Sequence, residues 1–228
     1  MMLILSDYDQ TLCFRGRVNI GDIEAIKKLI VSGNIMAISS SRNYESLYTD
    51  VKSHNIPFSF LCCNNGNAIF EGSRLIDHNP LNGEEQSAIR ELIPLLPKSA
   101  EINQFDAYGT LNKNAPVYYR ILLPENEAFE KYASFFSECG IETDYFMNYG
   151  LLFSKSRSKS YAGRYLANYC NISPEEVFAI GDGDNDYEML RDFNGYSFPW
   201  RSDILKQLEI PIVNSVSDMI GSVQRVLK

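Results

Sequence analysis

The feature that most constrains the fold of this chain is a pair of short apolar segments, each of which ends directly in acidic residues. The first covers residues 2–6 and the second covers residues 177–180. Short apolar runs that are bounded by turn-forming residues are typical of strands buried on both faces of a sheet. The acidic residues are Asp7 and Asp9 after the first run, and Asp182, Asp184 and Asp186 after the second. Because ligands of an open α/β sheet bind beyond the carboxyl ends of its strands, we expect the two segments to contribute to one site.

These acidic clusters indicate a bound cation. Two like charges 4 Å apart repel each other by about 4 kcal/mol at an effective dielectric constant of 20, so neighbouring carboxylates need a cation or protons to be tolerated. Ligand sets that contain only oxygen favour Mg²⁺ or Ca²⁺. The alternative for the run from Gly181 to Asp186 is a tight turn followed by a helix cap, for which Gly and Asp are common residues.

The spacing of apolar residues predicts an α/β fold. Before residue 80 and again after residue 155, strand-like apolar runs alternate with segments of helical periodicity. This alternation is the signature of a doubly wound parallel sheet of the Rossmann-like type. The predicted elements include strands 35–39 and 58–62, a hairpin over 68–76, a helix at 160–169, short strands at 195–198 and 211–213, and a closing helix at 217–227.

The pattern changes in the middle of the chain. The predicted elements there are a helix at 84–96, strands 100–108 and 117–123, a helix at 125–139, and a hairpin of strands 141–147 and 151–154 that turns at 148–150. This α-β-β-α-β-β order predicts a small α+β cap domain over residues 81–154, inserted into a core of residues 1–80 and 155–228. Strand alternation places Tyr118 and Tyr119 on opposite faces, so we expect only one of them to reach a ligand.

Composition narrows the class of protein. A chain of 228 residues of which 45% are hydrophobic can bury one main core and still form a second small module. The formal net charge of −8 and the lack of Lys and Arg clusters argue against a nucleic-acid surface. No apolar run approaches the length of a membrane span, and no basic leader precedes the first apolar run. The odd number of cysteines without C-x-x-C spacing suits a reduced cytoplasm, and we expect a monomer or a weak homodimer.

The two acidic segments also carry a resemblance to a known family. DYDQTL, from Asp7 to Leu12, and GDGDND, from Gly181 to Asp186, resemble motifs one and four of the haloacid dehalogenase-like (HAD) phosphohydrolase superfamily. Ser40 with Arg42, and then Lys159, follow in the order of motifs two and three. The middle segment resembles the class two, subtype B cap of Cof-type, sucrose-phosphatase-like and phosphoglycolate-phosphatase-like proteins. The resemblance implies a Mg²⁺-dependent phosphatase for a small phosphorylated metabolite, such as a sugar phosphate or phosphoglycolate.

The resemblance also implies catalytic roles. Asp7 would attack phosphorus and become an aspartyl phosphate, and Asp9 would protonate the leaving oxygen and then activate water. Ser40 would hydrogen-bond the transferred phosphoryl group, and Lys159 would neutralise charge on Asp7 and on that group. Gln10 departs from the family pattern, in which glycine is common after the second aspartate, and it leaves the shape of that turn open.

Metal and phosphate contacts follow from the same resemblance. The Mg²⁺ ligands would be the carboxylates of Asp7 and Asp182 and the backbone carbonyl of Asp9, while Asp186 would bind the metal or orient its surroundings. Ser41, Arg42 and Asn185 would contact phosphate together with Ser40 and Lys159. Ser41 stands where the family usually has glycine, Arg42 has an alternative role in a structural ion pair, and Asn185 has an alternative role as a helix cap.

Two other functions remain open at this level. A phosphomutase or phosphotransferase of the same superfamily would pass the phosphoryl group to a sugar instead of to water, although mutase relatives have a fourth motif richer in glycine. A regulatory module that keeps the fold without turnover would have no reason to retain Asp7, Asp9, Lys159 and Asp182 together.

Overall fold

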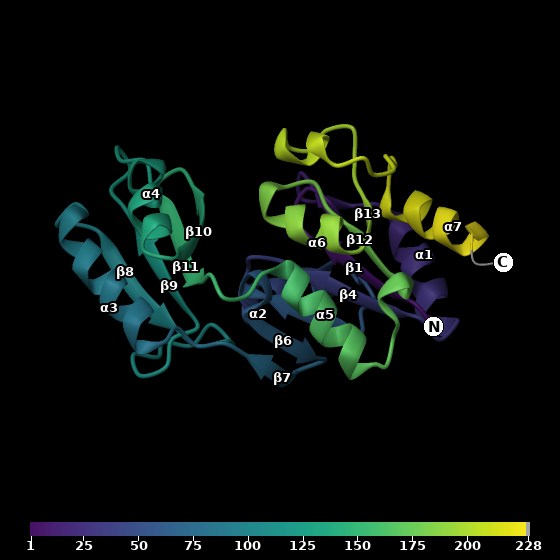
Figure 1. Ribbon diagram of the computed structural model, residues 1–228, viewed down its shortest axis with the longest axis horizontal. Coiled ribbons are helices and arrows are strands. Elements are labelled where there is room, and N and C mark those ends of the chain that lie inside the picture. The colour runs from purple at the N-terminus through teal and green to yellow at the C-terminus, as the bar shows by residue number, and fades with distance from the viewer. Residues whose placement is uncertain (227–228) are drawn as a thin grey trace.

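A seven-stranded, mainly parallel sheet forms the centre of the larger part of the molecule, which is described by a computed structural model for residues 1–226 (Figure 1). Its strands are β1 (Leu3–Asp7), β4 (Ile35–Ser39), β5 (Phe60–Cys63), β6 (Ala68–Glu71), β7 (Arg74–His78), β12 (Val177–Ile180) and β13 (Asn194–Tyr196). They lie in the order β13-β12-β1-β4-β5-β6-β7, and only β6 and β7 run antiparallel to their neighbours. The predicted fold class is therefore confirmed, with an antiparallel edge added to the parallel sheet.

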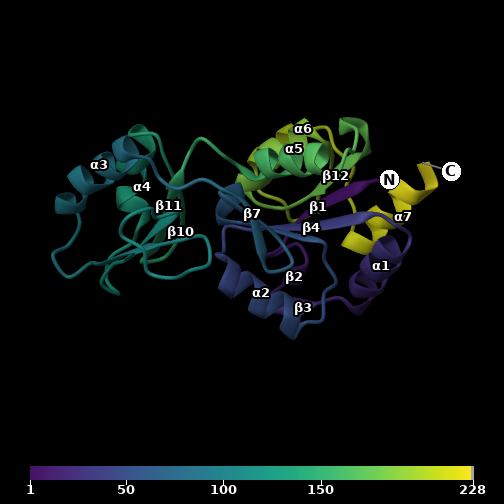
Figure 2. The same cartoon turned by 90° about the horizontal axis from the view of Figure 1, so that it is seen from below.

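Burial on both faces explains the apolar strands. In β1, Leu3 and Leu5 pack into the cluster on one face of the sheet, while Ile4 packs into the cluster on the other. Helices α5 (Lys159–Tyr169) and α6 (Tyr187–Asp192) cover the first face. The opposite face is covered by α1 (Ile20–Val31), α2 (Tyr44–Ser53) and α7 (Val216–Val226) (Figure 2). The end of the predicted helix 217–227 falls on residue 227, outside the described residues.

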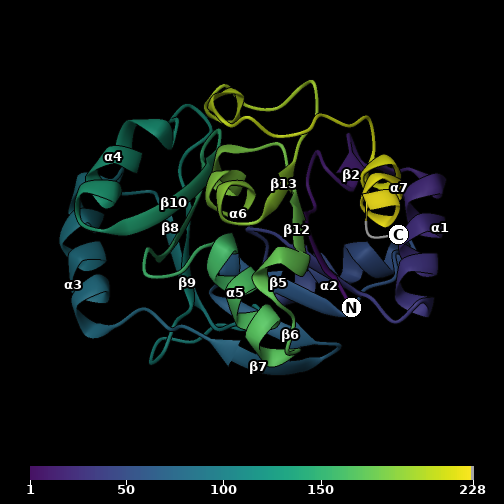
Figure 3. The same ribbon diagram turned by 45° about the vertical axis from the view of Figure 1, so that its right-hand side comes forward.

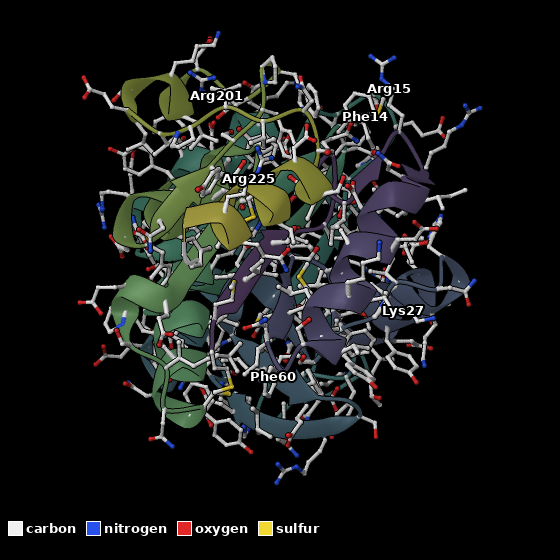
Figure 4. All side chains as sticks on the ribbon, turned by 90° about the vertical axis from the view of Figure 1, so that its right-hand side faces the viewer. Phe14, Arg15, Lys27, Phe60, Arg201 and Arg225 are labelled. Atoms are coloured by element: carbon white, nitrogen blue, oxygen red, sulfur yellow. The ribbon has the colours of Figure 1, made fainter. Side chains whose placement is uncertain are left out.

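A short hairpin follows β1. Its strands are β2 (Cys13–Phe14) and β3 (Arg17–Val18), and Arg15 and Gly16 form the turn with positive φ angles of 51° and 74°. Figure 4 shows Arg15 pointing away from the body of the molecule. The hairpin brings the chain back toward the sheet, so Thr11 and Leu12 stay buried beside the end of β1.

A separate four-stranded antiparallel sheet lies beside the larger one. It has the order β10-β11-β9-β8, with β8 (Glu101–Phe105), β9 (Tyr118–Leu122), β10 (Ile141–Phe146) and β11 (Tyr149–Ser154). Helices α3 (Gly83–Leu92) and α4 (Glu130–Glu138) lie on its side away from the larger sheet (Figures 1 and 3). Tyr119, Phe129 and Leu152 belong to the buried cluster between this sheet and its helices. The other face of the small sheet is not covered by a helix of the described chain.

Three boundaries in the small sheet region differ from the sequence prediction. Helix α3 ends at Leu92 and continues only as a 3₁₀ turn, Ile93–Leu95, because Pro94 lacks the N–H that a further α-helical hydrogen bond requires. Helix α4 begins five residues later than predicted, since residues 124–128 form a turn after β9. The hairpin turns at Met147 and Asn148, and Gly150 lies inside β11, where the ring of Phe129 leaves no room for a Cβ atom.

Two chain segments connect the two sheets, near residues 79–82 and 155–158, and they are tied together. The side-chain amide of Asn79 donates to Oδ1 of Asn67 and to Oγ of Ser156, each at 2.9 Å. A third connection is made at Tyr108, between β8 and β9: its ring centroid lies 5.1 Å from that of Phe70 and 5.7 Å from that of Tyr44, and its carbonyl accepts the N–H of Glu45 at 3.3 Å. Between residues 1 and 226, no helix is both long and apolar enough to cross a membrane.

Candidate functional site

The carboxyl ends of β1 and β12 lie side by side. The two strands are paired in parallel from Leu3 opposite Val177 to Ser6 opposite Ile180, so the residues that follow them leave the sheet at the same edge. One carboxylate oxygen from each of Asp7, Asp182 and Asp186 lies within 4.8 Å of the others. The two acidic segments therefore meet in space although 175 positions separate Asp7 from Asp182.

Lys159 lies at the centre of this cluster and is only 1% exposed. Its Nζ is 2.7 Å from Oδ1 of Asp7 and 2.7 Å from Oδ1 of Asp186, and 3.4 Å from the side-chain oxygen of Asn185. As the first residue of α5, it is held where the chain enters the helix against the turn at Gly66. A buried lysine between two carboxylates places a fixed positive charge beside Asp7.

Asp186 organises the loop that follows β12. Its Oδ2 accepts the backbone N–H groups of Asp182 and Gly183, at 2.9 and 3.0 Å, while its Oδ1 accepts from Lys159. A Cβ atom at Gly181 would collide with the Asp186 carboxylate, so the tight loop requires glycine at that position. Asp186 is thus bonded mainly to the protein, and it links Lys159 to the backbone that presents Asp182.

Burial controls the charge of the cluster. It raises the pKa of Asp7 well above the usual range of a carboxyl group, although contact with Lys159 opposes the shift. It also raises the pKa of Asp182 to about 6, against the hydrogen bond from Thr11, which lowers it. Burial alone would lower the pKa of Lys159, but the carboxylates of Asp186 and Asp7 outweigh it and raise that pKa. Lys159 therefore stays charged. The cluster holds three carboxylates, and Lys159 is the cation that contacts two of them.

The oxygen ligands available in this cluster suit a divalent cation. Asp7 uses Oδ1 to accept from Lys159, and Asp182 uses Oδ1 to accept from the Thr11 hydroxyl at 2.8 Å. Within residues 1–226, neither Asp7 Oδ2 nor Asp182 Oδ2 accepts a hydrogen bond. Two buried or partly buried carboxylate oxygens without a donor favour a hard cation such as Mg²⁺, which prefers oxygen ligands.

Asp9 lies apart from these three carboxylates and is paired with Arg42. The guanidinium donates from Nη2 to Oδ1 of Asp9 at 2.6 Å and from Nε to Oδ2 at 2.9 Å. Its third nitrogen, Nη1, donates to Asp50 at 2.8 Å. Each oxygen of Asp9 thus accepts one hydrogen bond from Arg42 and keeps a second lone pair for a ligand.

The remaining predicted phosphate contacts lie around this edge of the sheet. Ser40 is buried after β4, whose Ser39 is paired with Asp7, and its hydroxyl accepts the N–H of Arg42 at 3.2 Å. Ser41 is partly exposed beside Arg42. Asn185 is exposed, and its amide donates to Oδ1 of Asn65 at 3.2 Å.

A cavity of about 230 Å³ opens beside Asp9 and lies between the two sheets. We name it the leaving-group cavity. Its lining residues are Asp9, Ser41, Arg42, Asn43 and Ser46 from the larger part, and Tyr118, Asp144, Tyr145, Phe146, Tyr149 and Leu151 from the small sheet. Tyr118 lines this cavity whereas Tyr119 is buried on the opposite face, so the predicted placement of the two rings on opposite faces is confirmed.

Three contributors to the site were not assigned from the sequence. Thr11 holds Asp182, Asn65 holds Asn185, and Asp50 holds Arg42. Thr11 lies inside the first acidic motif, and Asn65 lies in an Asn-Asn-Gly run where three successive residues have positive φ angles, so each carried a local signal. Asp50 lies within a helix and carried none.

Comparison with known proteins places the chain among a defined group of enzymes. A sequence model described as haloacid dehalogenase-like hydrolase matches residues 4–135 and 110–198. A search of curated proteins by sequence finds no significant match.

Solved structures share the fold over nearly the whole length. A HAD-superfamily phosphatase from Bacteroides thetaiotaomicron superposes with a TM-score of 0.77 at 16% identity, covering 99% of this chain and 94% of that one. A subclass IIB sugar phosphatase superposes with a TM-score of 0.74 at 16% identity and 99% coverage of both chains. A putative HAD/COF-like hydrolase from Plasmodium vivax gives 0.79 at 16% identity, covering 99% and 96%.

Proposed function

The chain belongs to the haloacid dehalogenase-like hydrolase family, and from this premise we propose that it is a Mg²⁺-dependent phosphatase that hydrolyses a small phosphorylated metabolite. The observation that carries the proposal is the contact of buried Lys159 with Asp7, in the same cluster as Asp182. A carboxylate that is held beside a fixed ammonium group at the carboxyl end of a strand is suited to attack an anionic phosphate ester.

Asp7 acts as the nucleophile in this proposal. One carboxylate oxygen of Asp7 forms a bond to phosphorus while the bond from phosphorus to the ester oxygen breaks, which leaves an aspartyl phosphate, and the other oxygen stays with Lys159 and the metal. Lys159 and the Ser40 hydroxyl lie where they can offset charge on the transferred group. Asp186 holds Lys159 in place, so its role is to position that charge.

Asp9 supplies the proton steps. Once released by Arg42, a protonated Asp9 gives its proton to the leaving oxygen, and the resulting carboxylate then takes a proton from the water that attacks the aspartyl phosphate. The hydrolysis returns Asp7 as a carboxylate and releases inorganic phosphate. The leaving-group cavity lies beside Asp9, where the departing alcohol would be held.

The side chains of Asp7 and Asp182, with the backbone carbonyl of Asp9, would hold Mg²⁺. When bound, the ion supplies positive charge that shields the attacking carboxylate and the phosphate from each other. Thr11 fixes one oxygen of Asp182, which leaves the other oxygen for a metal.

The small sheet and its helices would serve as a cap. We assign the cap to residues 81–154, since the covered face of the small sheet packs on α3 and α4 while its other face meets the core. It would exclude water and select the substrate without taking part in the phosphoryl transfer. The cavity of about 230 Å³ is smaller than the roughly 300–1,000 Å³ of pockets that hold drug-sized ligands, which favours one sugar or a shorter group.

Phosphate release from a panel of phosphorylated metabolites tests this function. With Mg²⁺ we expect turnover of at least one ester, and EDTA should abolish it until Mg²⁺ is restored, because the clustered carboxylates repel a dianionic phosphate without a cation. Asp7→Asn should reduce the rate by at least about a thousandfold, since the amide lacks the nucleophilic oxygen.

Glu175→Gln is the control, because Glu175 is an exposed carboxylate just before the amino end of β12, at the opposite edge of the sheet from the site. It should leave the rate unchanged. Full activity of Asp7→Asn, or full activity after exhaustive chelation, would remove the proposed mechanism. Transfer of the phosphoryl group to a second sugar at the expense of phosphate release would assign a phosphotransferase instead.

A further inference from the structure

The uncovered face of the small sheet presents a row of side chains toward the core. Strand pairing joins Asp144 to Leu151, Leu151 to Arg120 and Arg120 to Asn103, so these four lie on one face. Neighbouring rows on that face contain Phe105, Tyr118 and Phe153, which are buried in the same cluster as residues of the larger sheet. The face that carries Asp144 is therefore the face that meets the core.

Asp144 projects into the leaving-group cavity opposite Asp9. Its carboxylate accepts no hydrogen bond from the chain between residues 1 and 226, and it forms no ion pair there. A partly buried carboxylate without a donor is unsatisfied in the protein, so it is available to accept hydrogen bonds from a ligand.

No unpaired cation offsets this charge among the residues that line the cavity. Arg42 is bonded to Asp9 through two nitrogens and to Asp50 through the third, so its charge is already shared by two carboxylates. Arg120 lies in the same row as Asp144, but its guanidinium sits over the ring of Phe105 at 4.8 Å and does not line the cavity. The lining side chains therefore carry two carboxylates, those of Asp9 and Asp144, against one guanidinium, that of Arg42, and Arg120 adds positive charge from outside the lining.

A second carboxylate on the same strand faces the neighbouring cavity. Glu142 is two residues before Asp144 and so lies on the same face of β10, where it lines a cavity with Asn185 and Lys159. Two arginines of that cavity are paired, Arg157 with Asp77 and Arg164 with Asp192. Lys155 faces Glu142 and lowers its pKa against the larger effect of burial, which raises it.

Aromatic rings complete the wall of the leaving-group cavity. Tyr118, Phe146 and Tyr149 all come from the small sheet, and the last two are at least 36% exposed. Aromatic faces pack against the C–H groups of a sugar ring and attract ammonium groups, whereas they offer nothing to a carboxylate.

We infer that the cap selects against a second negative charge: the leaving group is a polyol, either neutral or bearing an amine, whose hydroxyl or ammonium donors bind Asp144. This inference rests on the proposed phosphatase function and narrows its substrate class. Esters whose leaving group carries a carboxylate, phosphoglycolate among them, are poor substrates. Asp144 is the residue that makes this distinction, and it takes no part in the phosphoryl transfer itself.

A matched pair of substrates tests the inference. Glucose 6-phosphate and 6-phosphogluconate share their carbon chain and differ by a carboxylate, and glucosamine 6-phosphate adds an ammonium group. With the Mg²⁺-loaded enzyme we expect kcat/KM to be at least about tenfold higher for glucose 6-phosphate than for 6-phosphogluconate, since like charges in a partly buried cavity repel appreciably. Glucosamine 6-phosphate should equal or exceed glucose 6-phosphate.

Asp144→Asn should reduce the ratio of kcat/KM between the neutral and acidic esters at least about threefold, mainly through a lower KM for the acid, because Asn keeps the shape and can donate to a carboxylate. Glu130→Gln is the control: Glu130 is an exposed carboxylate on α4, at the covered side of the small sheet, and its loss should leave the ratio unchanged. Asp144→Ala removes the charge without adding a hydrogen-bond donor. Its ratio of kcat/KM therefore shows how much of the effect of Asp144→Asn comes from the lost charge alone.

Two kinds of failure are distinguishable. If the enzyme hydrolyses 6-phosphogluconate as well as glucose 6-phosphate, or if Asp144→Asn leaves the ratio as it is, the inference is wrong while the phosphatase function stands. If no ester of the panel is hydrolysed, the proposed function is wrong, and the same three esters are then titrated into Asp7→Asn protein. Equal affinity for the neutral and acidic esters in that titration would overturn the charge selection independently of turnover.

Discussion

The Thr11 hydroxyl contributes a single hydrogen bond, and that bond fixes the carboxylate of Asp182. It donates to Oδ1 at 2.8 Å from a buried position just beyond β1, so it links the two acidic segments directly. With Oδ1 held, the rotation of the carboxylate is restricted and Oδ2 faces the cluster. Groups that hold a metal ligand in this way typically change metal affinity by 10–100-fold when they are lost.

Thr11→Val should therefore weaken Mg²⁺ binding by about tenfold, because valine keeps the branched shape of threonine and removes only the hydroxyl. Calorimetric titration of Mg²⁺ into the protein measures this directly. Thr11→Ser, which keeps the hydroxyl, is the matched variant and should bind Mg²⁺ nearly as well as the parent. Equal affinity in the valine and serine variants would show that the hydrogen bond does not organise the metal site.

The limits of sequence reasoning at the residue scale follow from such contacts. Asp7 and Asp182 were assigned because clustered carboxylates after buried strands indicate a cation, whereas Lys159 was assigned from the family resemblance, and the structure brings the three together. Thr11 was marked only by its place inside the first acidic motif and Asp50 by nothing, because neither a threonine in a turn nor an aspartate in a helix reveals which site residue it supports. Their roles depend on which distant residue the fold places beside them.

Among the elements, the turn between β5 and β6 is the support for helix α5. Asn64, Asn65 and Gly66 all have positive φ angles, and the α carbon of Gly66 packs against the backbone carbonyl of Ser158, one residue before Lys159. Position 66 requires glycine for two reasons. Its φ of 88° disfavours any residue with a Cβ atom, and such an atom would collide with the Ser158 carbonyl.

Gly66→Ala should destabilise the protein by more than its backbone angle alone explains. Gly72 provides the comparison, because it also has a positive φ, 60°, but a Cβ atom there would meet nothing within 4 Å. Gly72→Ala should cost about 1–2 kcal/mol for the left-handed conformation. Gly66→Ala should add about 1–3 kcal/mol for the displaced Ser158 carbonyl and should also lower activity, since Lys159 shifts with it. Urea unfolding midpoints and phosphate release measure both effects, and equal losses in the two variants would contradict the account.

Element types were more predictable than their ends. The sequence predicted the α-β-β-α-β-β order of the middle segment because apolar periodicity reports the buried face of each element. The start of α4 was wrong because Pro124 and Glu125 are typical of a first helical turn, whereas residues 124–127 form a separate turn that the bond from the Glu127 N–H to the Pro124 carbonyl closes. The hairpin turn was wrong because Gly150, which normally marks a turn, lies in β11 to accommodate Phe129.

At the scale of the whole molecule, the cap and the core share one apolar cluster. Phe105, Tyr118 and Phe153 of the small sheet belong to the same buried cluster as Leu47 and Val51 of α2. Tyr118 also accepts a hydrogen bond from the side chain of Asn43 at 2.8 Å. The two sheets are therefore joined by packing as well as by their two connecting segments.

Thermal unfolding should for this reason occur in a single transition, with equal calorimetric and van't Hoff enthalpies. Tyr108→Ser removes the ring that packs on Tyr44 and Phe70, and aromatic contacts of this kind contribute about 0.5–1.5 kcal/mol each beyond their buried area. We expect the transition of this variant to broaden or divide as the cap unfolds first. Leu95→Ser, at an exposed apolar residue of the cap, should keep the single transition. A single sharp transition in both variants would mean that Tyr108 does not couple the two parts.

Topology rules made the position of the site predictable, but they did not predict which residues line the cavity beside it. Parallel strands release their carboxyl ends at one edge, so two acidic segments on such strands had to meet. The leaving-group cavity depends on how the small sheet docks, and docking is decided by contacts such as Asn43 with Tyr118 that have no local sequence signature.

The pairing of β1 with β12 determines when activity can arise during synthesis. Strand β1 is apolar on both faces and receives β4 early, but its other edge stays open until residues 177–180 have emerged from the ribosome. An unpaired apolar edge in a nascent chain is prone to misassembly. Until β12 docks, Asp7 also lacks Asp182 and Asp186 as neighbours. An interrupted translation product that ends before β12 would thus combine an aggregation-prone half-sheet with a nucleophile that has no site around it.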